Sequence, residues 1–341
     1  MNCWPRTPPH CRTGSGDQAV SATLDLLVVG DINPDVVVRG APRELAFGQA
    51  EQLAEGADLG LGGSAAITAC GASRLGLSTA IVGAVGDDAA GRLSLDELAR
   101  RGVDTTSVRV VQERASGLTV HVLSGADRAM ITSRGTLDEL EASAVPSGLV
   151  TAARHVHVAS FYLQPRLAPG LRGLFEAAHA AGATTSLDLN WDPAERWQGG
   201  LAELLPVVDI LFVNAAEAAG VSGAADPAVA ATVLNALGPL PVVKLGAAGG
   251  LAHDGCRLVH VDAPDADVVD SVGAGDSFDA GFLCGRLSGW TVGRSLALGV
   301  VCGSLSTRAA GGIRAQPSRA EAEAAMAGLL PAGDDAEECG R

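Results

Sequence analysis

The chain is poor in lysine, in aromatic side chains and in positive charge overall. Lys244 is the only lysine among its 24 basic residues, and aromatic residues make up 3% of the 341 residues. Acidic residues give a formal net charge of −15. Because nucleic-acid binding depends on clustered positive charge, this balance argues against a nucleic-acid partner. Any phosphorylated ligand therefore has to be held by individual groups in its binding site, because the net charge of the protein repels it.

The cysteines show no zinc-binding spacing, and we expect neither a secretory leader nor a membrane-spanning segment. The seven cysteines form no C-x-x-C pair, so we expect reduced core thiols, which are typical of the cytosol. The first residues carry Pro, Arg and Gly where a secretory signal would need an apolar run. No stretch reaches the roughly 20 apolar residues of a spanning helix. We therefore expect a cytoplasmic protein without membrane contact.

What the chain does have is a regular alternation of short β-branched runs and Ala- and Leu-rich stretches from Leu24 onward. Several of the short runs are apolar throughout, as in strands covered on both faces. The order predicts an α/β fold, a doubly wound and mostly parallel sheet with helices on both faces. The expected strands are 24–30, 79–86, 154–160, 183–189, 208–214 and 241–246. The expected helices are 64–75, 88–101, 168–181, 277–288, 291–308 and 318–328.

Two segments interrupt this alternation. Residues 35–40 are followed by a polar stretch without periodicity up to Gly60, and residues 116–135 are typical of a hairpin. Neither segment has a helix to cover it. We expect them to form a small β lid, at about 35–60 and 115–135, within one domain spanning 23–330. Residues 1–22 and the acidic stretch 331–341 are expected to be mobile tails.

The most informative run is residues 267–287, DVVDSVGAGDSFDAGFLCGRL. Small residues lead into an apolar helical face, so Gly273, Ala274 and Gly275 can expose backbone N–H groups at a helix start, a preformed anion site. Asp276 beside them suits a proton acceptor, and phosphoryl transfer needs both parts. The alternative is that the glycines only permit a loop and Asp276 only caps the helix. The local pattern leaves both interpretations open.

The run resembles the C-terminal signature D-T-x-G-A-G-D-x-F-x-x-G of the ribokinase-like, PfkB-type family of carbohydrate kinases. Residues 270–281 read DSVGAGDSFDAG, with Ser271 in place of Thr. The family's N-terminal signature, G-G-x-x-x-N-x-A-x-x-x-x-R-L-G, is matched by residues 62–76 except that Ile67 stands for Asn. The resemblance covers about residues 24–328. It implies an α/β sandwich with a β lid, the use of ATP with Mg²⁺, and phosphorylation of a hydroxyl group of a small carbohydrate.

The resemblance also implies roles for the residues that match the family's motifs. Asp276 would be the general base, and the N–H groups of 273–276 would stabilise the phosphoryl group in transit. Substrate contacts would come from Asn33, Asp35, Gly62, Gly63 and Asn190. Nucleotide contacts would come from Asn214, Lys244, Gly246 and Gly249. Glu217 would bind Mg²⁺ through water, and Asp270 and Val272 lie where many members respond to a monovalent cation such as K⁺.

Several rival classes lack their motifs. The chain has neither G-x-x-x-x-G-K-[ST] nor G-x-S-x-G, which excludes a P-loop nucleotidase and the commonest serine hydrolase pattern. Residues 60–65 match G-x-G-x-x-A, but a dinucleotide fingerprint needs a preceding strand and none is expected there. A ligand-binding relative that has lost catalysis and a nucleoside kinase stay open as alternatives. The low aromatic content favours a sugar or sugar acid, and the chain could be a monomer or a homodimer.

Overall fold

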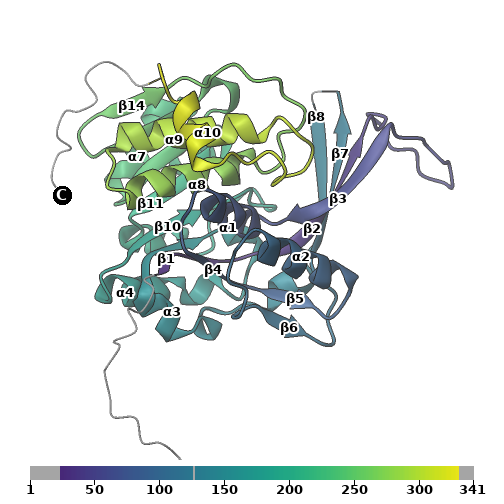
Figure 1. Ribbon diagram of the computed structural model, residues 1–341, viewed down its shortest axis with the longest axis horizontal. Coiled ribbons are helices and arrows are strands. Elements are labelled where there is room, and N and C mark those ends of the chain that lie inside the picture. The colour runs from purple at the N-terminus through teal and green to yellow at the C-terminus, as the bar shows by residue number, and fades with distance from the viewer. Residues whose placement is uncertain (1–23, 126, 330–341) are drawn as a thin grey trace, which may run out of the picture.

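The computed structural model describes residues 24–125 and 127–329 (Figure 1), so both predicted tails lie outside the described residues. The strands of the main sheet are β1 (Leu24–Val29), β4 (Thr79–Val82), β9 (Ala153–Val158), β10 (Thr184–Asp188), β11 (Ile210–Asn214), β12 (Leu240–Lys244), β13 (Gly250–His253) and β14 (Leu258–Val261). Their order is β14-β13-β12-β11-β10-β9-β1-β4. The pairings from β12 through β4 are parallel and those of β13 are antiparallel. The predicted mostly parallel sheet is confirmed.

Helices cover both faces of this sheet. They are α1 (Ser64–Arg74), α2 (Ala89–Arg100), α3 (Ser147–Ala152), α4 (Leu171–Ala180), α5 (Leu201–Leu204), α6 (Ala215–Ser222), α7 (Pro227–Ala236), α8 (Ala274–Leu287), α9 (Val292–Ser306) and α10 (Arg319–Ala325). Leu26 and Val28 of β1 belong to the core cluster that includes residues of α1, α8 and α9. Leu27 and Val29 belong to the opposite cluster, with residues of α4 and α7. Alternate residues of one strand thus serve two apolar layers, which explains the continuous apolar runs in the sequence.

A separate four-stranded sheet, here called the lid sheet, has the order β3-β2-β7-β8. Its strands are β2 (Asn33–Arg39), β3 (Gly56–Gly62), β7 (Leu118–Ser124) and β8 (Asp127–Ser133). The β7–β8 pair is antiparallel, as the predicted hairpin requires, and β2 pairs in parallel with β7. In Figure 1 this sheet projects to one side of the helices α1 and α8. Two segments far apart in sequence therefore build one surface.

Several predicted boundaries are wrong. Helix α8 begins at Ala274, ahead of the predicted start at 277. Residues 79–86 form two strands, because the chain leaves the main sheet after β4, and β5 (Ala84–Gly86) pairs with β6 (Arg109–Val111). The stretch before Gly60, for which no strand was expected, contains β3. That strand belongs to the lid sheet rather than to a βαβ unit, so the G-x-G-x-x-A match at 60–65 still does not form a dinucleotide fingerprint.

The described cysteines divide into two groups. Cys70, Cys284 and Cys302 are buried free thiols, as expected. Cys256 lies on the exposed turn between β13 and β14 and is disulfide-bonded, so it departs from the expectation of reduced core thiols. No helix within the described ranges is both long and apolar enough to span a bilayer.

Candidate active site

A cleft of about 1020 Å³ lies between the lid sheet and the carboxyl ends of the parallel strands. Ligand sites of open α/β sheets form at this edge. Of the predicted site residues, those lining the cleft are Asn33, Asp35, Gly63, Asn190, Asn214, Glu217, Lys244, Gly246, Val272, Gly273, Ala274, Gly275 and Asp276. Gly62, Gly249 and Asp270 are not among the lining residues. The fold thus brings most of the predicted set into one cavity.

The start of α8 presents unpaired backbone amides to this cleft. Gly273 has a φ of 71°, and a Cβ there would lie 2.6 Å from the Gly312 Cα, so glycine is required. The Ala274 N–H donates to the Ser271 carbonyl at 3.3 Å. Within the described ranges no partner is found for the N–H groups of Gly275 and Asp276. First-turn amides such as these are ready donors to an anion.

Asp276 is buried in the first turn of α8 and held from α1. The Ser64 hydroxyl donates to Asp276 Oδ1, and Asn190 Nδ2 donates to Ser64 Oγ at 2.8 Å and to Ser160 Oγ at 3.0 Å. Burial raises the pKa of Asp276 to about 7 and the Asp188 carboxylate adds to the rise, while Lys244 and the Ser64 bond oppose it. A carboxyl with this pKa can take up a proton near neutrality.

Asp31 fixes the start of α1, a role for which the sequence pattern gave no signal. Its two carboxylate oxygens accept hydrogen bonds of 2.9 Å from the Ser64 and Ala65 amides. Gly63, at the N-cap position with a φ of 83°, supplies no side-chain cap. The carboxylate of Asp31 therefore caps the helix from another segment. Because Ser64 is the residue that contacts Asp276, this cap also positions the candidate base.

Asn33 and Asp35 form a polar group at the lid end of the cleft. Asn33 Nδ2 donates to Asp35 Oδ1 at 3.1 Å, and His121 Nε2 lies 3.1 Å from Asp35 Oδ2. A Cβ at Gly62 would lie 2.0 Å from Asp35 Cγ. Gly62 thus leaves the space that the Asp35 side chain occupies. His121 was not predicted, although the alternation along 118–124 places it on the same face of β7 as Thr119, another lining residue.

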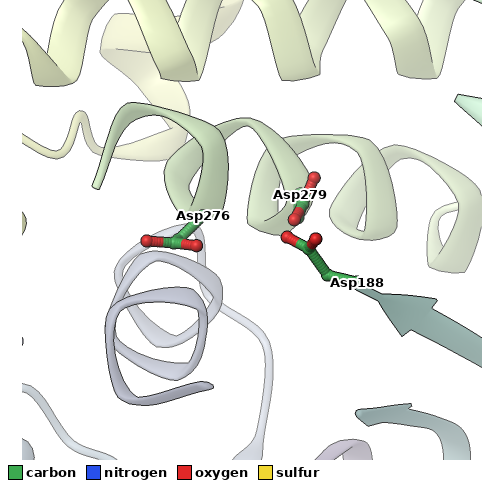
Figure 2. Close-up of side chains that lie close together, drawn as sticks. All are labelled: Asp188, Asp276 and Asp279. Carbon is green, nitrogen blue, oxygen red and sulfur yellow. The ribbon is translucent and has the colours of Figure 1, made fainter. Parts of the chain in front are cut away.

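A buried ion cluster lies beside Asp276. Lys244 Nζ is 2.8 Å from Asp188 Oδ2 and 3.1 Å from Asp279 Oδ2. Figure 2 shows Asp279 one turn along α8 from Asp276, facing Asp188 at the end of β10. These three carboxylates are close enough to share a metal ion. However, the ammonium group of Lys244 already contacts two of them, so it is the cation of this cluster.

The charges in the cluster follow from burial and pairing. Burial would lower the pKa of Lys244, but Asp188 and Asp279 outweigh it and hold that pKa well above its usual range. Burial would likewise raise the pKa of Asp188, and Lys244 reverses the shift and lowers it. Burial raises the pKa of Asp279 well above its usual range. We therefore interpret the cluster as an ammonium paired with the Asp188 carboxylate, with Asp279 protonated.

Asn214 and Glu217 form a capping box at the start of α6. The Asn214 amide and its Nδ2 donate to Glu217 at 2.8 and 2.6 Å, and Asn214 Oδ1 accepts from the Glu217 amide. Burial raises the pKa of Glu217 to about 7, with a further rise from Asp188. A carboxylate has about four lone-pair sites, so Glu217 keeps acceptor capacity toward the cleft. Its donor chemistry fits a hydrated Mg²⁺, which prefers oxygen ligands and retains waters.

Two of the residues outside the cleft lining, Asp270 and Gly249, make contacts that hold neighbouring segments together. Asp270 accepts from the Val272 amide at 3.0 Å and from the Gly311 amide at 2.9 Å, which ties together the loops before α8 and after α9. A Cβ at Gly249 would lie 2.0 Å from the Val261 carbonyl oxygen, so glycine allows β13 to begin against the end of β14. Of the residues in these contacts, Val272 lines the cleft, so Asp270 supports the cleft wall from behind.

Ile67, which replaces the Asn of the family signature, packs under the loop that leads into α8. It lines the cleft, and a Cβ added to Gly273 or Gly312 would lie 3.1 Å or 2.6 Å from its side chain. An apolar side chain therefore supports the anion-binding turn where a polar one is usual. This change lowers the number of hydrogen-bonding groups available to a ligand at that point.

Comparison with known proteins identifies the class. The family model for pfkB family carbohydrate kinases matches residues 23–319. An ATP-dependent ribose-1-phosphate kinase of Halopiger xanaduensis is 30% identical over 88% of this chain and 97% of its own. Adenosine kinase of Sinorhizobium meliloti is 26% identical, with a TM-score of 0.77 over 89% of this chain and 99% of that one. A putative ribokinase II of E. coli in complex with ATP and Mg²⁺ is 22% identical, with a TM-score of 0.76 over 88% and 98%, and supports the fold.

The architecture and the cleft are those of a ribokinase-like phosphotransferase. The chain belongs to the pfkB family of carbohydrate kinases. It is a kinase with an alcohol group as acceptor, in a family whose named members act on sugars and nucleosides.

Proposed function

We propose that the protein transfers the γ-phosphate of ATP, as its Mg²⁺ complex, to a hydroxyl group of a small sugar or sugar acid. The observation that supports this most is the position of Asp276. Its buried carboxyl group lies beside two amides at the start of α8 that have no partner among the described residues, in the same cleft as Asn33 and Asp35. A base and an anion site within one turn of helix are the two parts that phosphoryl transfer requires.

In the proposed step the acceptor hydroxyl oxygen attacks the γ-phosphorus in line. The bond from this phosphorus to the oxygen shared with the β-phosphate breaks, and that oxygen leaves with ADP. The Asp276 carboxylate takes the hydroxyl proton, and the amides of Gly275 and Asp276 donate to the oxygens of the moving phosphoryl group. Ser64 and Asn190 orient the base through their hydrogen bonds.

The other lining residues divide between the two substrates. Asn33 and Asp35 are proposed to hydrogen-bond the acceptor's hydroxyl groups, and Asn190 to do so beside the base. Asn214 ends β11, Glu217 lies in the first turn of α6 directly after it, and Gly246 follows β12. We propose that the nucleotide phosphates bind beside these residues. Glu217 would hold the waters of Mg²⁺, which when bound neutralises charge on the β- and γ-phosphates.

A nucleoside acceptor is the second candidate. Nucleoside sites usually stack the base on aromatic rings, and the cleft contains two aromatic side chains, Tyr162 and Trp191. The Trp191 side chain is exposed there, since the residue is 42% accessible. Although the whole chain has few aromatic residues, this cleft therefore has aromatic rings on which a nucleobase could stack.

A coupled assay of ADP release from purified protein tests the function. The acceptor panel contains neutral sugars, sugar acids, polyols and nucleosides, each with ATP and Mg²⁺, and phosphorus NMR identifies the product. We expect ADP release that depends on a sugar-type acceptor. Release only with nucleosides would support the second candidate, and release with no compound would contradict catalysis.

The rate should depend on pH through Asp276. Its pKa is raised to about 7, and only the ionised form can accept the hydroxyl proton. We expect kcat/KM to fall about tenfold for each pH unit below this value and to level off above it. A rate profile between pH 5 and 9 measures this limb.

Glu217 titrates in the same range and provides the control. Glu217→Gln should weaken the use of Mg²⁺ while the acid limb stays near pH 7. If the fall in rate at low pH disappeared in Glu217→Gln, the group that titrates near pH 7 would be Glu217 and not Asp276.

Removal of the β7–β8 hairpin tests the lid. A Cβ at Gly135 would lie 2.7 Å from the Ser116 oxygen, so the two ends of 117–134 already meet and can be joined directly. Because the hairpin contributes Thr119 and His121 to the cleft, we expect a higher acceptor KM. ATP hydrolysis without acceptor should also increase, since the lid excludes water. An unchanged KM with fully coupled turnover would contradict the assignment.

A further inference from the structure

A second cavity opens beside the main cleft. It has a volume of about 450 Å³, and its lining includes Phe161, Arg134, Tyr162, Pro193, Arg196 and Gln198. Three of these, Arg134, Tyr162 and Pro193, also line the main cleft. The side cavity, as we call it, therefore adjoins the main cleft and shares these three residues with it.

The loop of residues 190–200 builds one wall of the side cavity in an unusual backbone conformation. Asn190, Glu195 and Trp197 have φ values of 53°, 52° and 53°, a region that side chains other than glycine seldom adopt. Asp192 holds the loop by accepting from the Ala194, Arg196 and Trp197 amides at 2.8, 2.9 and 2.8 Å. Such strain persists where the surrounding structure fixes it, often at ligand sites.

The side cavity contains two arginines although the chain as a whole is acidic. Among the described residues that line it, the only acidic one is Asp192, and its carboxylate is engaged by the backbone. Arg134 has an ion pair with Asp138 at 3.3 Å. Burial would raise the pKa of Asp192, but backbone hydrogen bonds and the charge of Arg196 lower it, although no direct ion pair of the Arg196 guanidinium group is found within the described part of the chain. Two arginines against apolar walls suit a bound anion.

Tyr162 lines both cavities and carries a buried hydroxyl group. Its hydroxyl oxygen is buried and has no hydrogen-bond partner within the described residues. The ring is fixed by edge contacts with Phe161 and Trp197, at centroid distances of 4.9 and 5.9 Å. Burial of an unpaired hydroxyl costs free energy, so such a group calls for a partner. A ligand that extends from the main cleft past Tyr162 would supply one.

We propose that the side cavity is a second compartment of the acceptor site and binds an anionic group of the acceptor. This proposal rests on the proposed function and narrows its substrate class. The acceptor would carry a carboxylate or phosphate at the end remote from the hydroxyl group that is phosphorylated. Arg196 and Arg134 pair with the anion, and Tyr162 donates to the acceptor between the two compartments.

The test compares matched acceptors in wild-type protein, Arg196→Gln and Tyr162→Phe. The pairs are ribose and ribose 1-phosphate, fructose and fructose 1-phosphate, and glucose and gluconate, each with a free primary hydroxyl group. We expect wild-type kcat/KM to favour the anionic member. The ratio of anionic to neutral kcat/KM should fall about 10- to 100-fold in Arg196→Gln, the effect of one charge-assisted hydrogen bond. Arg100→Gln, on the exposed face of α2, is the matched control and should keep the wild-type ratio.

Binding without turnover separates this proposal from the proposed function. Calorimetric titration with ribose 1-phosphate or gluconate, in the presence of a non-hydrolysable ATP analogue that occupies the phosphate site, should show weaker binding in Arg196→Gln and Tyr162→Phe. The two ligands distinguish phosphate from carboxylate. Equal affinity in all variants, or a ratio unchanged by Arg196→Gln, would overturn the side-cavity proposal. Absence of ADP release with normal, Arg196-dependent binding would contradict the kinase chemistry and leave the side cavity supported.

Discussion

Asp276→Asn is expected to lower kcat by about 10²- to 10⁴-fold, the usual contribution of a general base. The substitution keeps the shape of the side chain, and Asn Oδ1 can still accept the hydrogen bond from Ser64. What it removes is the ability to take the acceptor proton. Single-turnover and steady-state assays of ADP release, at saturating ATP and acceptor, measure the loss.

Stability provides the control for that variant. The pKa of Asp276 is raised by folding from its ordinary value of 3.8 to about 7, so its ionisation costs stability in full above about pH 7. This cost shrinks as the pH falls below 7 and is gone only near the ordinary value. Asparagine carries no charge, so Asp276→Asn should unfold at the same or a higher temperature at pH 8, and should bind ATP normally. Asp96→Asn, on the exposed side of α2, is the matched control for an Asp-to-Asn change. Near wild-type turnover in Asp276→Asn would remove Asp276 from the proposed role.

The sequence was sufficient for the fold because the signal is repeated along the chain. Each buried strand needs apolar residues on both sides, so runs such as 24–30 and 208–214 predict covered, parallel strands. Local signals were weaker where glycine dominates. β3 has the sequence GADLGLG, which has too few side chains to show the alternation of apolar and polar residues typical of a strand. Strand β2 stabilises β3 by pairing with it, and the short stretch of sequence around β3 does not reveal this pairing.

The site was predictable where one segment carries several parts and less so where parts meet across the fold. Residues 273–276 are contiguous, and their turn and helix start can be inferred together. The contact of Asp31 with the start of α1 joins separate segments, and so does that of His121 with Asp35. The role of a glycine is also hard to predict from sequence, because it depends on which residue of another segment packs against it. The structure gives Gly62 the task of making room for Asp35, whereas a motif alone indicates only that a small residue is needed.

Lys244→Met is expected to have the largest effect on stability. From sequence, Lys244 was expected to contact the nucleotide; in the structure its ammonium group is buried between Asp188 and Asp279. Methionine has a similar length and fills the space, but it leaves the Asp188 carboxylate buried without a counter-ion. Breaking a buried pair in this way costs about 3–5 kcal/mol. Urea unfolding at pH 8 measures the loss.

The pH dependence of that loss distinguishes a charge effect from a packing effect. Without Lys244 the pKa of Asp188 should rise, and a carboxyl group with a raised pKa is penalised only at a pH where it is ionised. The deficit should therefore shrink as the pH falls from 8 to 5.5, and Lys244→Met with Asp188→Asn should recover most of it at pH 8. Lys244 also lowers the pKa of Asp276, so the acid limb of kcat/KM should move above pH 7 in Lys244→Met. A variant of wild-type stability that has lost only ATP affinity would instead show that Lys244 acts as a nucleotide contact.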